Sequence, residues 1–301
     1  MSVSVGVDFD FAKWIAARRG SQEQQAREGA AYAYSGELKF RRTLAIARPV
    51  TMALEATTRL WRDVARAELL GTAVKATDAT YAPILARVSE AAKAASAALH
   101  VKVPPIFGIP KTEIGIRVLG TDDAPHLIVD LELASKLDHG ELVAAIGHEL
   151  AHVQNGHIPF ATALYYLTHS AVFFIRWIVK PAIMTLQAWS RRAEVTCDRA
   201  ALLAVKDLDK ALMGLVKQEL GADKGAAFDA AEYLKAVPEP KKGLGRFGEL
   251  FRSHPYVPKR VHALRLFATS ALFASVTGQD TAGKPTAADI DKQVADLISV
   301  F

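Results

Sequence analysis

The chain has 301 residues, half of them hydrophobic, and a formal net charge of +5 at pH 7. This length allows a sizeable core in one large domain or two small ones. The positive surplus is mild, and no dense Lys/Arg block is interleaved with aromatics, which argues against nucleic-acid binding. The single cysteine, Cys197, excludes an intramolecular disulfide and a cysteine-rich zinc site, and we expect it to be a buried small hydrophobe. Any metal site must therefore use histidines and carboxylates.

Residues 1–42 are polar and of mixed charge, and we expect an N-terminal arm that carries a short helix. No basic segment precedes a long apolar run here, so the pattern is not that of a secretory signal and predicts a cytoplasmic protein. The alanine-rich stretches 43–70 and 73–100 place apolar residues near helical spacing, which predicts two long helices. Prolines in 101–112 predict a connector without regular structure.

Two short runs rich in β-branched and aliphatic residues follow, at 114–119 and 127–131. The turn-forming residues between them predict a β-hairpin. Helical periodicity then extends over 136–157, where Asp138 suits the N-cap and Glu141 the other half of a capping box. An Asn-Gly pair near the end of this segment predicts the helix terminus.

The most apolar part of the chain is 158–189, which we expect to form a helical hairpin inserted into the main domain. Two membrane-spanning helices would need about 40 apolar residues and a turn, whereas Arg176, Lys180 and Pro181 interrupt this segment. One interpretation is a hairpin packed over the domain or against a second copy of the chain. The other is a hairpin that touches a membrane surface, with tryptophans such as Trp189 at the interface.

Helical patterns return at 190–220 and again from Pro258 to about residue 276, on either side of a stretch rich in Gly, Pro and Lys. The expected organisation is an arm over 1–42, a main domain over 43–276, and a C-terminal linker and amphipathic helix over 277–301. Together these elements predict a mainly α-helical α+β fold with a small β-sheet.

The string GHELAH at 147–152 lies in the helix predicted over 136–157. Residues four apart share one face of a helix, so the imidazoles of His148 and His152 can bind one metal ion. Zinc suits this pair because it accepts histidine nitrogen and carboxylate oxygen, and it lowers the pKa of bound water to roughly 7. Glu149 can then act as the catalytic base, taking a proton from water and passing it to the leaving amine. The plain alternative is a pair of surface histidines on a helix.

A catalytic zinc site also needs a third protein ligand and an open position. His157 does not fit the metzincin spacing, because Asn155 and Ile158 stand where that pattern needs Gly and His, so we expect a helix-end or surface histidine. Glu194 is the better candidate, and Asp198 one helical turn later can hold the other N–H of a histidine ligand. The alternative for these two carboxylates is a solvated face that pairs with neighbouring arginines.

Three ordered segments resemble those of a known family. They are ELVAAIGHELAHVQNGH at 141–157, AEVTCDRAAL at 193–202, and Ser253-His254-Pro255 followed by Arg260 and Leu264. Over about residues 80–270 the chain resembles the zinc metallopeptidases that include the CAAX prenyl proteases and HtpX-type proteases.

This resemblance implies a gluzincin fold. The zinc ligands would be His148, His152 and Glu194, and Glu149 would be the base. It implies that Asp198 orients a histidine ligand and that His254 lies near the cleft and stabilises the oxyanion. Arg260 would be a structural or cleft-lining partner. An extended peptide substrate would pair with an exposed edge strand above the zinc helix, and 114–119 is the candidate.

The sequence therefore predicts a cytoplasmic zinc metalloendopeptidase that hydrolyses peptide or protein substrates. Residues 158–189 would provide any contact with a membrane surface or a second copy, and no nucleic-acid partner is expected. The rival interpretation is a catalytically idle membrane-surface or interaction scaffold that retains a structural zinc, which the intact Glu149 disfavours. A third is a latent protease whose arm, residues 1–42, blocks the cleft.

Overall fold

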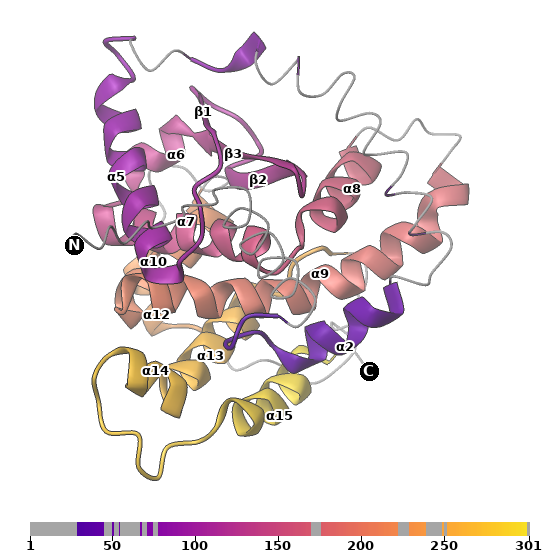
Figure 1. The fold of residues 1–301 in the computed structure, drawn as a ribbon, viewed down its shortest axis with the longest axis vertical. Helices are drawn as coiled ribbons and strands as arrows, with labels where there is room; N and C mark the ends of the chain where they lie inside the picture. The colour runs from indigo at the N-terminus through magenta and orange to yellow at the C-terminus, as the bar shows by residue number, and fades with distance from the viewer. Residues whose placement is uncertain are drawn as a thin grey trace, which may run out of the picture.

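The computed structural model describes residues 29–44, 50, 54, 67, 71–74, 78–169, 176–221, 229–238, 249 and 252–299. Over these residues the chain is mainly helical with a small sheet, as predicted (Figure 1). The elements are α2 (Ser35–Leu44), α5 (Ala82–Leu99), β1 (Ile106–Ile109), β2 (Ile116–Thr121), β3 (Ala124–Asp130), α6 (Leu131–Lys136), α7 (His139–Gln154), α8 (Ile158–His169), α9 (Arg176–Val205), α10 (Leu208–Val216), the π-helical turn η2 (Lys217–Gly221), α12 (Ala230–Lys235), α13 (Val257–Ala268), α14 (Ala271–Val276) and α15 (Ala287–Ile298). The helix predicted over 43–70 falls mostly outside the described residues.

Helix α7 lies at the centre of the fold, with the sheet on one side and α9 on the other (Figure 1). The predicted capping box is present, because Asp138 accepts from the Glu141 amide and the Glu141 carboxylate accepts from the Asp138 amide. The helix ends at the predicted pair, where Gly156 takes a left-handed φ of 65°. Every residue from Glu141 to His152 is buried, since α5 and α9 both pack along α7.

The sheet has the strand order β1-β3-β2. Strands β2 and β3 form the predicted antiparallel hairpin, with Val118 opposite Leu127. The prediction that 101–112 lacks regular structure is wrong for β1, which pairs in parallel with β3. Here the prolines flank the short apolar strand instead of interrupting it, as Pro105 and Pro110 lie just outside its ends. Strand β2 is therefore one edge of the sheet.

The two faces of the sheet are both covered. Ile116 and Val118 of β2 belong to the main core, together with residues of α5, α7 and α9. Leu119, which points to the opposite face, packs in a smaller cluster with the partly buried Tyr165 and Tyr166 of α8. Helix α8 therefore lies against the edge strand and becomes one wall of the space above α7.

The apolar stretch 158–189 forms α8 and the first half of α9, and residues 170–175 between them lie outside the described part. Helix α9 continues through Pro181. Trp189 is 1% exposed, and its assignment to a membrane interface is wrong. Among the described helices, none combines the length and apolar character needed to cross a bilayer.

The ends of the described chain pack onto the main core. The prediction of a separate arm over 1–42 is wrong for its described part, because the Ala30 amide donates to Asn155 Oδ1 at 2.9 Å and α2 packs on α9. The predicted C-terminal helix appears as α15, after residues 277–286, which form the expected linker without helix or strand. The helix itself packs on the main domain. It contacts α13, and Asp291 accepts from Arg199 of α9 at 2.7 Å. The helix expected from Pro258 to residue 276 is divided into α13 and α14, where Ser270 caps the second.

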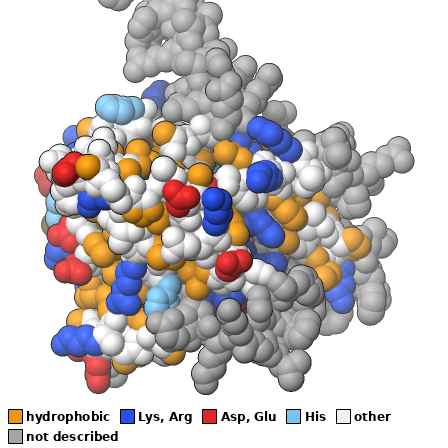
Figure 2. All heavy atoms as spheres, turned by 90° about the horizontal axis from the view of Figure 1, so that it is seen from below, with side chains coloured by type: hydrophobic (Ala, Val, Ile, Leu, Met, Phe, Trp, Pro, Cys, Tyr) orange, Lys and Arg blue, Asp and Glu red, His pale blue; other side chains and the backbone are white. Residues whose placement is uncertain are grey.

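The face formed around α14 and α15 mixes charges of both signs (Figure 2). Among the described residues drawn there, acidic and basic side chains are interspersed with hydrophobic ones. A nucleic-acid-binding face is expected to carry a field of one sign. The surface seen in this view therefore gives no support to nucleic-acid binding.

Candidate metal centre

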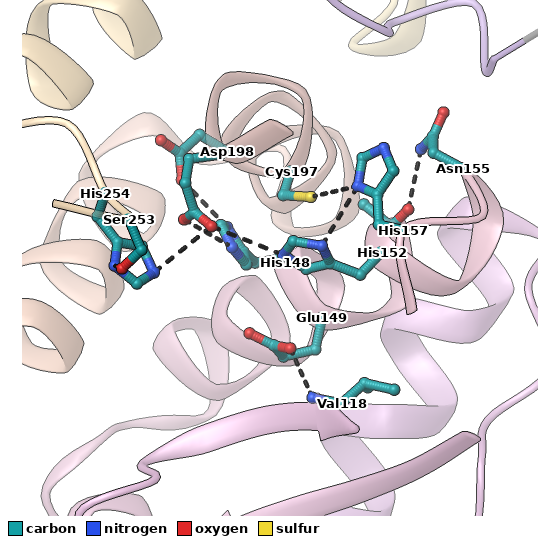
Figure 3. A network of polar contacts seen from close by, with 12 residues as sticks. Val118, His148, Glu149, His152, Asn155, His157, Cys197, Asp198, Ser253 and His254 are labelled. Carbon is teal, nitrogen blue, oxygen red and sulfur yellow. Dashed lines mark hydrogen bonds and ion pairs between the residues drawn. The ribbon is translucent and has the colours of Figure 1, made fainter. Parts of the chain in front are cut away.

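His148 and His152 lie one turn apart on the face of α7 that meets α9, and Figure 3 shows their side chains directed toward that helix. Their ring centroids are 5.3 Å apart, and both residues are buried. The alternative of two surface histidines is therefore wrong. Burial follows from the helix itself, because α7 is enclosed by α5, α9 and the sheet.

Glu194 of α9 faces both imidazoles. Its Oε2 lies 3.3 Å from His148 Nε2, and its Oε1 lies 3.8 Å from His152 Nε2. Donor atoms around a tetrahedral zinc ion with bonds of 2.0–2.2 Å are separated by about 3.4 Å, so this spacing fits a single divalent ion. Glu194 is 3% exposed, which excludes the solvated face that was the alternative.

Asp198, one turn further along α9, occupies the other side of His148. Its Oδ1 lies 3.1 Å from His148 Nδ1, which leaves Nε2 of that ring directed at Glu194. Burial alone would lower the pKa of His148, but Glu194 and Asp198 outweigh it and raise this pKa to about 10. Asp198 thus lies where a residue that orients the first ligand would be expected.

Arg260 of α13 is the cation behind these carboxylates. Its guanidinium donates to both oxygens of Asp198 at 2.9 and 2.6 Å, and to Glu219 at 2.7 Å. It also lies 3.1 Å from Glu194 Oε2. Burial alone would raise the pKa of Glu194, but His254, Arg260 and His148 hold it well below the usual range. Arg260 is 2% exposed and so lies inside the site, not on the wall of the cleft.

Glu149 lies beside His148 on α7 and points toward the sheet (Figure 3). Its Oε2 accepts from the backbone N–H of Val118, in edge strand β2, at 2.7 Å. Burial raises the pKa of Glu149 to about 7, although His148, Arg117 and the Val118 N–H oppose the rise. A carboxylate with a pKa near neutrality is well matched to proton transfer at ordinary pH.

His254 comes from the segment that precedes α13. Its Nε2 lies 3.5 Å from Glu194 Oε1, and its Nδ1 lies 2.9 Å from the Ser253 hydroxyl. With its side chain 24% exposed, it stands on the open side of the centre, whereas the two α7 histidines are enclosed. It shares a cleft with Arg117, Tyr165 and Gln218, which come from β2, α8 and η2.

His157 follows the end of α7, as the helix-end alternative expected, and only the surface alternative is wrong. It is 0% exposed, not a surface histidine, and its Nδ1 lies 3.2 Å from His152 Nδ1 (Figure 3). The left-handed turn at Gly156 directs the chain back beside the end of α7. In the sequence, this glycine indicated where the helix ends, but not where the His157 side chain points. Cys197 is buried as expected, with its Sγ 3.8 Å from His157 Nδ1.

Comparison with known proteins identifies the family. Residues 118–268 match the family model for peptidase family M48. The chain belongs to peptidase family M48. This confirms the resemblance stated from the sequence. The M48 region runs from β2 to the end of α13, so it contains every residue of the predicted site, while α2, α5 and β1 precede it.

Two M48 relatives match parts of the chain. It is 36% identical over 86 residues to the plastoglobule-localized metallopeptidase 48, chloroplastic, of Arabidopsis thaliana, covering 28% of this chain and 25% of that protein. It is 26% identical over 176 residues to protease HtpX of Hydrogenovibrio crunogenus (strain DSM 25203 / XCL-2), covering 48% of this chain and 57% of that protein. The chain thus spans only a quarter to just over half the length of these relatives. No solved structure matches it significantly.

Proposed function

We propose that the chain is a zinc-dependent endopeptidase with His148, His152 and Glu194 as ligands. The observation that supports this most strongly is the convergence of two imidazole nitrogens and one carboxylate within 3.3 and 3.8 Å in a buried site. A divalent ion held there supplies Lewis-acid chemistry, and zinc fits this set of donors. Membership of M48, and the protease and metallopeptidase names of its relatives, support a peptide or protein substrate.

Glu149 is the proposed general base. Its carboxylate reaches into the same cleft as the ligands, and its raised pKa keeps the proton affinity needed to deprotonate an attacking water. The same carboxyl then returns the proton to the leaving amine. General acid–base catalysis of this kind contributes about 10²- to 10⁴-fold to the rate.

The edge of β2 is the proposed place for the substrate backbone. Three of its outward backbone groups contact side chains: the Val118 N–H contacts Glu149, the Gly120 N–H contacts Thr162, and the Ile116 carbonyl contacts Gln218. An extended peptide that adds to this edge would replace these contacts by main-chain hydrogen bonds. A substrate carbonyl on the Val118 N–H would also release Glu149 for reaction with water.

The remaining predicted residues take supporting roles in this proposal. His254 stands on the open side of Glu194, where its ring can donate to the oxyanion that forms on the scissile carbonyl. Asp198 fixes the orientation of His148 through Nδ1. Arg260 neutralises the carboxylates behind the site.

The test is peptide hydrolysis by the wild type and by Glu149→Gln. We expect the variant to lose about 10²- to 10⁴-fold in kcat/KM, with its zinc content unchanged. Glu113→Gln, an exposed carboxylate near the start of β2, is the matched control and should keep full activity. A substrate blocked at both termini distinguishes internal cleavage from removal of terminal residues.

The scaffold alternative predicts a different outcome. If wild type and Glu149→Gln cleave equally, or if neither cleaves while both bind zinc, the centre is structural and the proposal is wrong. The latent-protease alternative now concerns only residues 1–28, because 29–42 pack into the core. Activity that rises after removal of 1–28 would support it.

A further inference from the structure

A second buried chain of polar groups lies behind His152, on the side away from Glu194. His157 Nδ1 is 3.2 Å from His152 Nδ1, and His157 Nε2 is 3.4 Å from Glu37 Oε1 on α2. Both His157 and Glu37 are 0% exposed. The indole of Trp189 donates to the same Glu37 oxygen at 3.1 Å and packs edge-on against the His157 ring. The side chains of His152, His157 and Glu37 therefore connect the candidate metal centre to α2.

The chemistry of imidazole allows only one proton arrangement along this chain when His152 binds a metal ion through Nε2. Its Nδ1 must then carry the proton and needs an acceptor. His157 Nδ1 is that acceptor only if the proton of His157 sits on Nε2. A carboxylate facing Nε2 favours that tautomer, and Glu37 is placed there.

The remaining contacts agree with this assignment. In the described part of the chain, His157 Nε2 and Glu37 Oε2 have no hydrogen-bond partner of good geometry, so the carboxylate at 3.4 Å is the available acceptor for the ring N–H. Cys197 can offer only a weak S–H donor to His157 Nδ1 at 3.8 Å. Arg41 Nε lies 3.7 Å from Glu37 Oε1, and this cation favours the ionised carboxylate beside His157.

We propose that Glu37 and His157 are positioning residues that set the tautomer of His152 and so tune metal affinity. This inference rests on the proposed function, in that it takes His152 as a ligand. It places part of the metal site in α2, outside the region that matches M48. Asp198 serves His148 in the equivalent way from inside that region.

The experiment measures zinc affinity of the purified full chain by competition with a chelator, using the metal alone as probe. Outer groups that hold a ligating histidine change metal affinity by about 10- to 100-fold. We therefore expect Glu37→Leu and His157→Phe each to weaken zinc binding by about that factor. Because the two act in series, the double variant should be no weaker than His157→Phe. Glu37→Gln keeps an acceptor oxygen toward His157 and should restore most of the affinity.

A merely structural role for α2 is tested by Leu44→Ala. Leu44 is an apolar residue buried in the same hydrophobic cluster as Trp189, so this variant loosens α2 without removing a polar group from the His152–His157–Glu37 series. We expect it to lower the unfolding free energy and leave zinc affinity unchanged. The visible spectrum of the cobalt-substituted protein should shift in Glu37→Leu and His157→Phe, and not in Leu44→Ala.

The outcomes separate this inference from the function it builds on. Wild-type protein that binds no zinc would overturn both. Normal zinc binding and Glu149-dependent cleavage, together with Glu37 and His157 variants that bind zinc like wild type, would overturn only the positioning role. Loss of affinity in Leu44→Ala equal to that in Glu37→Leu, or additive losses in the double variant, would do the same.

Discussion

The two histidines that face Glu194 from α7 are supported in different ways. Behind His148 stands a charged network, in which Asp198 accepts from its ring and Arg260 neutralises Asp198. Both partners come from α9 and α13, inside the region that matches M48. The support of His148 is therefore electrostatic.

Behind His152 stands a second imidazole, His157, and only then a carboxylate, Glu37. The pKa values of the two histidines move in opposite directions: burial, with the neighbouring His157 and His148, holds that of His152 well below its usual range, whereas that of His148 is raised. Two residues of one type, a single turn apart, thus have different supports: a carboxylate with its arginine behind His148, and a second imidazole backed by a carboxylate behind His152. The support of His148 lies within the matched region, whereas that of His152 extends to α2, which lies outside it.

The largest effect is expected from removing Glu194, the carboxylate that faces both histidines. Glu194→Ala deletes the carboxylate that faces both histidines, so we expect zinc affinity to fall by on the order of 10³-fold, about 4 kcal/mol. Glu132→Gln is the control, because this carboxylate lies on α6 and pairs with Lys111 and Lys136. Chelator competition measures both variants. Unchanged affinity in Glu194→Ala would mean that the two histidines do not share this ligand.

The next largest effect is expected from the network of Arg260 and carboxylates behind His148. Arg260→Leu leaves the buried Asp198 and Glu194, and the partly exposed Glu219, without their cation. Breaking such a network costs about 3–5 kcal/mol of unfolding free energy. Denaturant unfolding should show a smaller loss in zinc-loaded protein, because the ion neutralises Glu194.

Lys259→Met provides the matched control for Arg260→Leu. Lys259 is a buried cation on the same helix, but it pairs with Glu249 away from the histidines. Its loss should destabilise the protein equally with and without zinc. If zinc reduced the effects of both variants to the same extent, the charged support would not be specific to His148.

The difference between the two sides also explains what sequence could predict. The pairs His148/His152 and Glu194/Asp198 each lie four apart on one helix, and helical spacing brings each pair to one face. That these faces meet was inferred from the need of a catalytic zinc site for a third ligand, and from the resemblance to a family. His157 follows a left-handed glycine and Glu37 lies more than a hundred residues away, so no local pattern relates either one to His152.

The fold shows the same division between local and distant contacts. The capping box of α7 and the β2–β3 hairpin depend on neighbours in sequence, and both were predicted at the right place. Strand β1 forms only because β3, some twenty residues later, offers a parallel partner. Likewise, the sequence placed α2 and α15 outside the main domain. These helices pack against α9 and α13, which are distant in sequence, so no adjacent residues indicate the contact.

A third prediction tests how closely α7 must approach α9. A Cβ on Gly147, the residue before His148, would lie 2.7 Å from the Ala204 Cβ of α9. Gly147→Ala should therefore separate the helices slightly and lower the unfolding free energy by about 1–3 kcal/mol. Zinc affinity should fall too, because separating the helices moves Glu194 and Asp198 of α9 away from the histidines of α7. The contact between His157 and His152 should be kept, because both follow α7.

Ala204→Gly supplies the compensating change for Gly147→Ala. The double variant should regain both stability and zinc affinity, because the two methyl groups clash only with each other. Strictly additive losses in this cycle would show that the close approach of the helices is not what holds His148 against its α9 partners.

The smallest expected effect acts on the start of α7 and should treat both histidines alike. Asp138→Ala removes the N-cap and should lower the unfolding free energy by about 1 kcal/mol, with zinc affinity unchanged because the cap lies more than two turns before His148.

Burial alone would raise the pKa of Asp138, but Lys210 and the Glu141 amide outweigh it and lower this pKa below 3.8. The charge of Asp138 thus stabilises the fold above about pH 4, and this contribution disappears as pH falls through the lowered pKa. Asp138→Asn keeps a capping oxygen without the charge, so unfolding measured against pH should show its small deficit only at the higher pH values. A deficit that persists in strong acid would assign the effect to the shape of the cap, and altered zinc affinity would show that the start of α7 does distinguish its two ligands.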